Sequence, residues 1–177
     1  MLNNNDLLNL IDIEKVLHQL LLQIRTSTSS DAGTIYLKNG DCLKFCVFQN
    51  DSLSSIQIKQ MEEDNKFLRL PLIDKRYIAV KSFLSLSTIR INDIQQKNDL
   101  FLDGIKDFDM KYGFTTHSMV TIPLVDIFSK NPIRILQIIN KVKDKEFIPY
   151  SDMDLEFIKI ASSFISFNIS KAIEYKE

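Results

Sequence analysis

The chain has 177 residues, 45% of them hydrophobic, so it is long and apolar enough to bury the core of one domain. Its 22 basic and 23 acidic residues leave a net charge of -1, which excludes a broad electrostatic attraction to nucleic acid or to a membrane surface. No apolar run approaches the ~20 residues that span a bilayer, and the residues after Met1 lack the positive start of a signal peptide. We therefore expect a cytoplasmic protein with no nucleic-acid or membrane partner.

The first predicted element is an amphipathic helix over residues 6–27. Asp6 is suited to cap its N-terminus, and Arg25 suits its C-terminal end. Its apolar residues recur at intervals of three or four, as on one helix face: Leu7, Leu10, Ile13, Leu17, Leu20 and Ile24. A polar break over residues 26–30 ends it.

Two strands joined by a tight turn are predicted next, over residues 33–38 and 42–49. Asn39-Gly40 between them favours a type I′ turn, because both central residues of that turn need positive φ. Cys42 and Cys46 are four residues apart on the second strand, which separates them by about 13 Å at ~3.3 Å per residue. That distance is too long for a disulfide, so we expect two free thiols.

The chain between these strands and residue 117 is predicted to form short elements. They are, in order, a helix starting near residues 56–58, a strand over 67–72, a helix over 77–86, a strand over 88–91, a helix over 97–111 and a connection over 109–117. Pro71 suits a strand at the edge of a sheet, because proline cannot donate to a neighbouring strand.

The strongest strand signals are two apolar runs rich in β-branched residues, 118–125 and 133–141. Each run is too short for a buried helix, and the polar connection between them is short. We predict an antiparallel hairpin at the centre of the sheet.

The last predicted element is a helix over residues 151–176. Ser151 and Asp154 have the spacing of a capping box. One apolar face has the members Leu155, Ile158, Ser162, Ile165, Ile169 and Ala172, and a second has Phe157, Ile160, Ala161, Phe164 and Phe167. A helix that is apolar nearly all round needs two partners.

The order of elements predicts one α+β domain over residues 1–177. Residues 33–141 would form a central antiparallel sheet of about six strands, with the two terminal helices covering one face. The short helices and loops of residues 73–117 would then enclose a pocket on the other face, where small molecules bind in such folds.

Several stretches match one known family in their order and spacing. They are residues 31–37 (Asp-Ala-Gly-Thr-Ile-Tyr-Leu), 45–51, 70–72, 78–79, 112–119 (Tyr-Gly-Phe-Thr-Thr-His-Ser-Met), 122–124 and 136–141 (Leu-Gln-Ile-Ile-Asn-Lys). Over residues 6–176 the chain resembles a GAF domain, the small-molecule-sensing module of phosphodiesterases, cyclases and histidine kinases. Its opening stretch, with Gln-Asn-Asp-Ser at residues 49–52, is similar to GAF domains joined to HD-type phosphohydrolases.

The resemblance implies a structural latch at the start of the last helix. Cyclic-nucleotide-binding GAF domains carry Asn-Lys, a variable gap, then Phe, three residues and Asp-Glu, and the lysine and aspartate pair. Here Asn140, Lys141 and Phe147 match, whereas the last pair becomes Ser151-Asp152. We expect Lys141 to reach Asp152 or Asp154.

The resemblance also implies a set of ligand contacts. They are Thr34 on the first strand, Phe48 and Gln49 on the second, Ala79, Asp109, Tyr112 and Thr116 around the lid, and Gln137 on the last strand. Phe48 falls where an aromatic ring stacks on a purine. Gln49 and Gln137 replace residues that are often acidic, and Tyr112 fills the place of a threonine. These departures disfavour cyclic nucleotides without excluding a nucleotide as the small-molecule ligand.

Residue types argue against several other chemistries. A metal site needs several convergent ligands, but the only histidines are His18 and His117, and no Cys-x-x-Cys is present. His117 is the one candidate axial ligand for haem, and no cysteine follows residue 47 to attach a bilin. Some stand-alone GAF proteins reduce free methionine sulfoxide with cysteines, which leaves Cys42 and Cys46 as an enzymatic alternative. We expect no catalytic residue, no metal and no cofactor.

The terminal helices carry more apolar surface than one sheet covers, which predicts a homodimer through a helical bundle, with a wide intramolecular stripe as the alternative. The last helix has no stop signal at residues 174–177, so we expect it to continue into an output domain. The predicted function is a non-catalytic sensor domain of bacterial-type signal transduction. The rival is a ligand-free dimerisation scaffold whose cavity is filled by aromatic residues: Phe48, Phe83, Phe108 and Tyr112.

Overall fold

The computed structural model describes residues 4–64, 69–94 and 102–174, and the side chains of residues 13–64, 69–94 and 102–170. An antiparallel sheet with the strand order β3-β2-β1-β6-β5-β4 runs through its centre, and β7 pairs with the end of β6. The strands are β1 (Ser30–Asn39), β2 (Cys42–Asn50), β3 (Arg69–Pro71), β4 (Ile89–Ile91), β5 (Met119–Val125), β6 (Pro132–Lys143) and β7 (Glu146–Phe147). The helices are α1 (Asn4–Ser27), α2 (Ser55–Glu63), α4 (Ile78–Ser85), α5 (Asp103–Tyr112) and α6 (Asp152–Glu174). The predicted α+β fold is confirmed.

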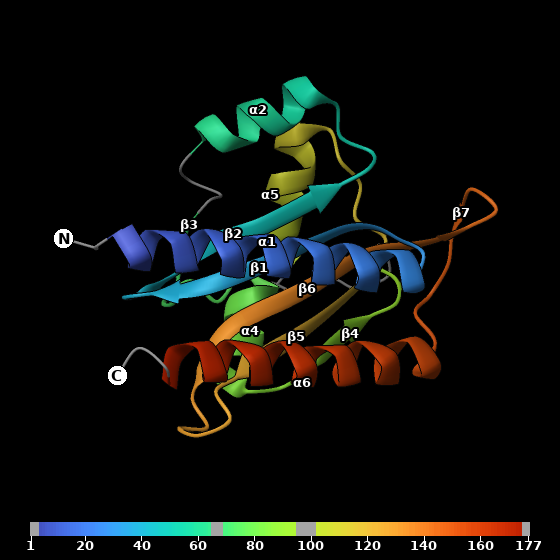
Figure 1. Ribbon diagram of the computed structural model, residues 1–177. Helices are drawn as coiled ribbons and strands as arrows, with labels where there is room; N and C mark the ends of the chain where they lie inside the picture. The colour runs from blue at the N-terminus through green and yellow to red at the C-terminus, as the bar shows by residue number, and fades with distance from the viewer. Residues whose placement is uncertain (1–3, 65–68, 95–101, 175–177) are drawn as a thin grey trace.

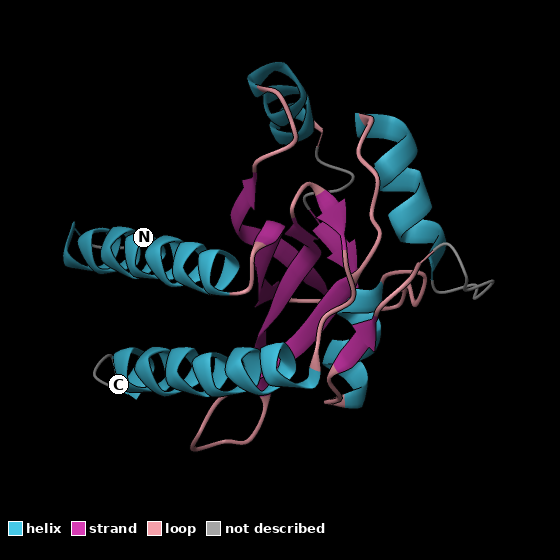
Figure 2. Ribbon diagram, turned by 90° about the vertical axis from the view of Figure 1, so that its right-hand side faces the viewer, coloured by secondary structure: helices cyan, strands magenta, loops and turns pink. Residues whose placement is uncertain are grey.

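Helices cover both faces of this sheet. Figure 1 shows α1 and α6 side by side on one face, and Figure 2 shows α4 and α5 on the other, with α2 above the sheet edge. The start of α1 and the end of α6 lie at the same end of the molecule in both views. No helix in the described residues carries a stretch long and apolar enough to cross a bilayer.

The larger core lies between the sheet and the two terminal helices. Strand side chains alternate between faces, and in β5 and β6 the even-numbered apolar residues face the helices. The strands contribute Ile35, Val47, Val120, Ile122, Leu124, Leu136 and Ile138; the helices contribute Leu17, Leu21, Ile24, Ile158, Ile165 and Ile169. This alternation leaves Met119, Ile135, Gln137 and Ile139 for the opposite face.

A buried arginine ties the end of α1 to the first hairpin. The Arg25 guanidinium donates to the Asp31 carbonyl oxygen at 2.6 Å and to Gln49 Oε1 at 3.1 Å, and it pairs with Asp51 at 2.6 Å. Arginine suits this position because its planar group offers five donors in a fixed geometry. The sequence predicted only its place near the helix end.

The structure differs from the predictions in the first turn, in two helix boundaries and in the order of the strands. The first hairpin turns at Gly40-Asp41, and only Gly40 has positive φ (59°), so the turn has the type II′ pattern rather than type I′. Helix α1 already begins at Asn4, so Asp6 lies inside it, and α5 continues to Tyr112, so the following connection begins only at Gly113. In the sheet β1 and β6 are central, and β5 lies next to the edge strand β4. The predicted residues 67–68, 97–101 and 175–176 lie outside the described part of the chain.

The docking of α1 gives a stability prediction from two adjacent leucines. Leu21 is 0% exposed in the core, whereas Leu22 is 46% exposed on the outer side of the helix. We expect Leu21→Ala to lower the free energy of unfolding by about 2–5 kcal/mol, because it leaves a cavity in a packed core. Leu22→Ala is the matched control and should change it far less. Equal losses in urea denaturation would contradict this packing of α1.

Candidate ligand cavity and its connection to α6

The sheet face opposite α1 and α6 forms the floor of a cavity of about 70 Å³. The strand register aligns floor residues of β2, β1, β6 and β5 in rows that cross the sheet. The middle row contains Phe48, Thr34, Gln137 and Thr121; one neighbouring row contains Asn50, Ala32, Ile139 and Met119, and the other contains Phe45, Tyr36, Ile135 and Pro123. A polar centre therefore lies between two rows of mostly apolar residues.

An irregularity in the first hairpin places two phenylalanines of β2 in the cavity. The register between β1 and β2 shifts between Ile35 and Tyr36, so Tyr36 faces Phe45 while Thr34 faces Phe48. Both rings line the cavity, although they are three positions apart and regular alternation would place them on opposite faces. The extra residue of such a bulge re-aims the side chains that follow it. Tyr36 and Phe45 stack with ring centroids 4.8 Å apart, which makes one wall aromatic.

The roof of the cavity comes from α4, α5 and the loop that follows α5. Its lining residues are Tyr77, Ile78, Ala79, Gly104, Ile105, Phe108, Phe114 and Thr116. Gly104 allows α5 to approach Tyr77, because a Cβ at this position would lie 2.5 Å from a ring carbon of that tyrosine. The helices thus close over the sheet with little free space between them.

Three polar side chains in the floor have hydrogen-bonding atoms for which the described residues supply no partner. Gln137 Nε2 donates to Thr121 Oγ1 at 3.1 Å, and no described group donates to Gln137 Oε1. Asn50 Oδ1 accepts from two turn amides, at 2.8 and 2.9 Å, but its buried Nδ2 has no hydrogen-bond partner among the described residues. The Thr34 hydroxyl likewise makes no hydrogen bond within the described chain. An unpaired buried polar group is costly, so Asn50 Nδ2 marks where an acceptor of a bound molecule would be stabilised.

The loop over the cavity is held by a carboxylate. Asp109 on α5 accepts from the Thr116 amide at 2.7 Å and from the Thr116 hydroxyl at 2.8 Å. Burial raises the pKa of Asp109, and the two hydrogen bonds from Thr116 offset part of that rise. Asp109 itself does not line the cavity, but it positions Thr116, which does.

Five of the eight predicted ligand contacts line the cavity, and three do not. The five are Thr34, Phe48, Ala79, Thr116 and Gln137. Gln49 lies on the opposite face, where Nε2 bonds to the His18 carbonyl oxygen at 2.8 Å, because neighbouring strand residues point to opposite sides. Asp109 acts through Thr116. Tyr112 lies one turn beyond Phe108, packs with Met61 and donates its hydroxyl to Asp64 at 3.2 Å.

Several lining residues were not predicted. They are Tyr36, Phe45, Asn50 and Phe114, whereas Phe108 was predicted only as a ring that fills the cavity in the scaffold alternative. The alternation of strand side chains could have identified Asn50, since it lies two residues from Phe48 on the same strand face.

The histidine and the cysteines that were considered for haem binding and for thiol catalysis lie outside the cavity. His117 stacks on Phe147 with ring centroids 3.8 Å apart, and neither ring lines the cavity. Cys42 and Cys46 are free thiols outside the cavity. Cys46 packs against the core under α1, and burial raises its pKa. The described residues contain no group of three or more side chains arranged to hold a metal ion.

A buried asparagine connects the cavity loop to β6. Asn140 has a left-handed backbone, with φ 57°, and is 0% exposed. Its Oδ1 accepts from the His117 amide at 2.7 Å and the Ser118 amide at 3.3 Å, and its Nδ2 donates to the Thr115 carbonyl oxygen at 2.7 Å. These bonds hold the main chain on both sides of Thr116.

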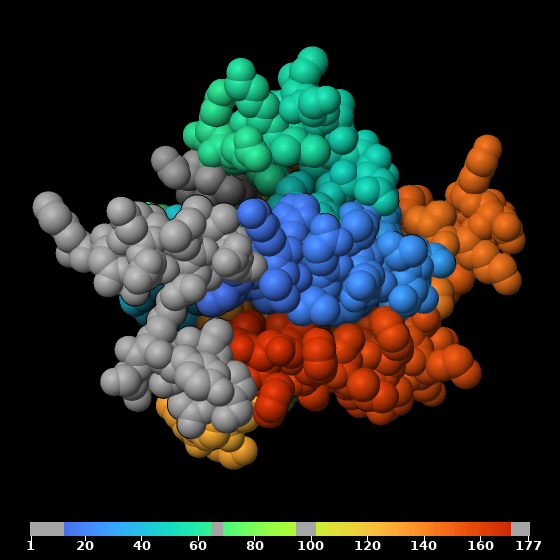
Figure 3. Space-filling model, viewed as in Figure 1, coloured from blue at the N-terminus to red at the C-terminus, as the bar shows by residue number. Residues whose placement is uncertain are grey.

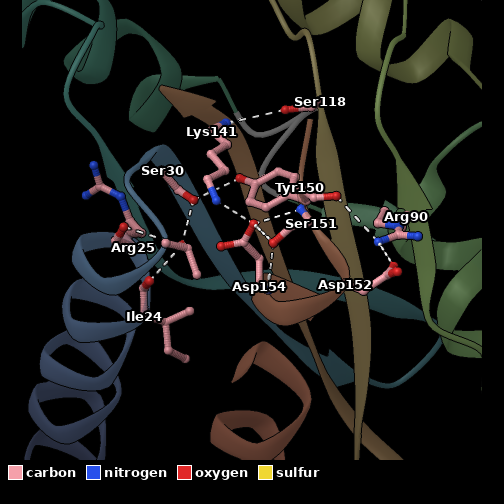
Figure 4. Close-up of polar contacts among 11 residues, drawn as sticks. Ile24, Arg25, Ser30, Arg90, Ser118, Lys141, Tyr150, Ser151, Asp152 and Asp154 are labelled. Atoms are coloured by element: carbon pink, nitrogen blue, oxygen red, sulfur yellow. Dashed lines mark hydrogen bonds and ion pairs between the residues drawn. The ribbon is translucent and has the colours of Figure 1, made fainter. Parts of the chain in front are cut away.

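The next residue connects β6 to α6. Lys141 Nζ pairs with the Asp154 carboxylate in the first turn of α6, and the Lys141 amide donates to Ser118 Oγ at 3.3 Å (Figure 4). Asp154 also accepts from the amide and hydroxyl of Ser151, and Ser151 Oγ accepts from the Asp154 amide at 3.1 Å, which is a capping box. Of the two expected partners of Lys141, Asp154 is the one that pairs with it, so Asp152 is not part of the latch. Asp152 pairs with Arg90 at 2.7 Å.

Hydrogen bonds also run from α1 to the start of α6. Figure 4 shows Tyr150 beside Ser30, with its hydroxyl 2.8 Å from Ser30 Oγ. Ser30 Oγ lies 2.7 Å from Thr28 Oγ1, which donates to the Ile24 carbonyl oxygen at 2.7 Å. Both terminal helices are thus fastened at the same end of the sheet.

Comparisons with known proteins identify the fold. No protein-family model and no curated protein matches the sequence. Among solved structures, the GAF domain region of a putative membrane protein from Geobacter sulfurreducens has a TM-score of 0.69 at 14% identity, covering 97% of this chain and 99% of that one. A GAF domain/HD domain protein from the same organism has a TM-score of 0.69 at 13% identity, covering 92% and 95%. The type II free methionine-R-sulfoxide reductase from Thermoplasma acidophilum has a TM-score of 0.60 at 10% identity, covering 89% and 92%. The chain has the GAF fold.

Replacing Asn140 tests how the cavity loop is held. Glycine keeps the left-handed backbone accessible, so Asn140→Gly removes mainly the side-chain bonds. Each buried main-chain group left unpaired costs about 1–3 kcal/mol, so we expect a loss of at least about 2 kcal/mol in unfolding free energy and faster hydrogen exchange at the His117 and Ser118 amides. Asn131→Gly, in an exposed loop, is the control. Unchanged exchange at both amides would show that Asn140 does not hold the loop.

The pairing of Asp154 predicts a dependence on pH. Burial alone would raise the pKa of Asp154, but the hydrogen bonds from Lys141 and Ser151 outweigh burial and lower it. The stabilisation is therefore present above the unfolded pKa of about 4 and is lost as the pH falls through the lower folded pKa. We expect Asp154→Asn to lower the urea midpoint at pH 7 and to approach wild type below about pH 4. The exposed Glu63→Gln serves as control. A deficit as large at low pH as at pH 7 would contradict the assignment.

Proposed function

We propose that this GAF-fold chain is a non-catalytic regulatory sensor domain, in which a small molecule in the cavity acts on α6 and, through it, on an attached output domain. One observation carries this proposal: Asn140 and Lys141 are adjacent, and they bind the cavity loop and the first turn of α6 respectively. A ligand that touches Thr116 would change the loop that Asn140 holds. A difference in ligand affinity between two arrangements of α6 would then shift their populations.

Signalling through α6 requires a partner for its outer face, and we propose a second copy of the chain. Five exposed apolar residues follow one another at spacings of four, three, four and three: Met153, Phe157, Ile160, Phe164 and Phe167, which are 41–82% exposed. This is the spacing of a coiled-coil seam. Figure 3 shows α6 at the molecular surface beside α1. The seam extends for about 21 Å along the helix at 1.5 Å per residue, and the same seam on a second copy would complete a symmetric pair.

The solved structures agree with a regulatory role without establishing it. One neighbour is a GAF domain/HD domain protein, and another is a domain of a putative two-component sensor histidine kinase protein from Sinorhizobium meliloti. These descriptions support an output domain of this general kind. The reductase from Thermoplasma acidophilum supports the enzymatic alternative, but a cysteine-dependent reaction needs a reactive thiolate at the substrate. Neither cysteine lines the cavity, and burial keeps Cys46 protonated by raising its pKa.

The size of the cavity favours one second candidate, a dimerisation scaffold that binds no ligand. A volume of about 70 Å³ is well below the 300–1,000 Å³ of typical ligand pockets. Phe48 and Phe108 take up part of the space beneath α5, as the scaffold alternative requires. The two functions make opposite predictions for Phe48.

Thermal-shift screening of wild type and Phe48→Ala distinguishes them. For a sensor, a compound should raise the wild-type midpoint in a concentration-dependent way, and the effect should weaken in the variant, because stacking on Phe48 is worth about 1–3 kcal/mol. For a scaffold, no nucleotide, amino acid or metabolite should shift either protein. Phe48→Ala should then only cost stability, up to about 3–5 kcal/mol.

The proposed dimer makes a separate prediction. Phe164→Glu places a charge in the middle of the seam, so we expect light scattering to show a dimer for wild type and a monomer for the variant, with helix content unchanged. Met110→Glu is the control, because Met110 is also apolar and exposed, 81% against 58% for Phe164, but lies on α5. A wild-type monomer, or a Phe164→Glu dimer, would contradict the proposed interface.

A further inference from the structure

The lining of the cavity contains no side chain that carries a charge at neutral pH and could neutralise a charged ligand. None of its residues is Asp, Glu, Lys, Arg or His. The Asp109 carboxylate, which accepts two hydrogen bonds from the lining residue Thr116, would repel an anion. A phosphate or carboxylate buried there would lose its hydration without gaining a counter-charge, which is unfavourable. The lining therefore selects against anionic molecules.

The spare hydrogen-bonding groups describe the molecule that fits. Asn50 Nδ2 is a buried donor without a described partner, and its residue lies one row from the polar centre of the floor. Gln137 Nε2 is already used by Thr121, so this amide offers its carbonyl oxygen as an acceptor. The Thr34 hydroxyl, opposite Gln137 in the register, can serve in either role. A ligand with an acceptor and a donor close together, as in an amide or a lactam, would satisfy these groups.

The walls limit the ligand to one ring. Tyr36, Phe45 and Phe48 present aromatic surface, and aromatic rings pack well against a flat molecule. The cavity of about 70 Å³ is smaller than the ~150 Å³ that holds benzene, so a ring requires a side chain to turn. Phe48 is half-buried and, with Phe45 and Asn50, also lines a groove between α1 and α2. Its ring can therefore turn toward that groove while keeping contact with the ligand.

We infer that the cavity binds an uncharged, planar, single-ring molecule that carries an amide or lactam group, with Asn50 donating to its carbonyl oxygen. This inference rests on the proposed sensor function and names the chemical class of its ligand. It excludes cyclic nucleotides, because their phosphate would be buried without a counter-charge.

Nicotinamide and nicotinate are suitable probes, because they share one ring and differ in having a neutral amide or an anionic carboxylate. We expect nicotinamide to cause saturable shifts in the amide NMR signals of Thr34, Asn50, Thr116 and Gln137 in the full chain. Nicotinate at the same concentration should bind at least tenfold more weakly. Asn50→Asp keeps an Oδ1 acceptor for the turn amides but removes the Nδ2 donor, and it should weaken nicotinamide binding at least tenfold. Asn131→Asp, in the exposed β5–β6 loop, is the matched control and should leave nicotinamide binding unchanged.

The possible failures are distinguishable. Cavity shifts from nicotinate or cyclic AMP that equal or exceed those from nicotinamide would overturn the ligand class and leave the sensor function in place. Unchanged nicotinamide affinity in Asn50→Asp would overturn the role of Asn50. No cavity shift with any of the three probes would overturn the ligand class and favour the scaffold over the sensor.

Discussion

The left-handed backbone at Asn140 is the constraint on which the connection between cavity and helix depends. In this conformation the buried side chain reaches three main-chain groups of the loop that carries Thr116. Asparagine tolerates positive φ better than most residues and has both an acceptor and a donor to offer. The following residue, Lys141, then pairs with Asp154 in the first turn of α6. A change at the loop therefore has a short covalent and hydrogen-bonded route to the helix.

The two faces of the sheet have different physical roles. The face under α1 and α6 is apolar, and the ends of both helices are fastened to it by Arg25 and by the Tyr150–Ser30 hydrogen bond. The other face keeps a polar centre inside a small space, where atoms such as Asn50 Nδ2 lack described partners. Packed cores resist gradual deformation, so a ligand on the second face would act by shifting the sheet and its helices as packed units. The exposed seam of α6 would then carry that shift between two copies.

The sequence predicted the elements with strong periodicity and missed what depends on register. The apolar runs of β5 and β6, the two terminal helices and the Ser151 capping box follow from local patterns. The bulge opposite Ile35 and Tyr36 does not, since it arises from the pairing of β1 with β2. The resemblance placed both Phe48 and Gln49 at the ligand, although adjacent strand residues cannot share a face. The same alternation would have pointed to Asn50. The sequence left two aspartates as possible partners of Lys141. The capping geometry at the start of α6 selects Asp154.

The most direct test of the coupling is a double-mutant cycle between the cavity loop and α6. Thr116→Val removes the hydroxyl that Asp109 holds, and Asp154→Asn removes the charge that pairs with Lys141. Unfolding free energies of wild type, both single variants and the double variant would give the interaction energy between the two sites. Because the sites are joined through Asn140 and Lys141, we predict an interaction energy of at least about 0.5 kcal/mol. Strict additivity of the two substitutions would show that the loop and the helix are energetically independent, and it would contradict the account.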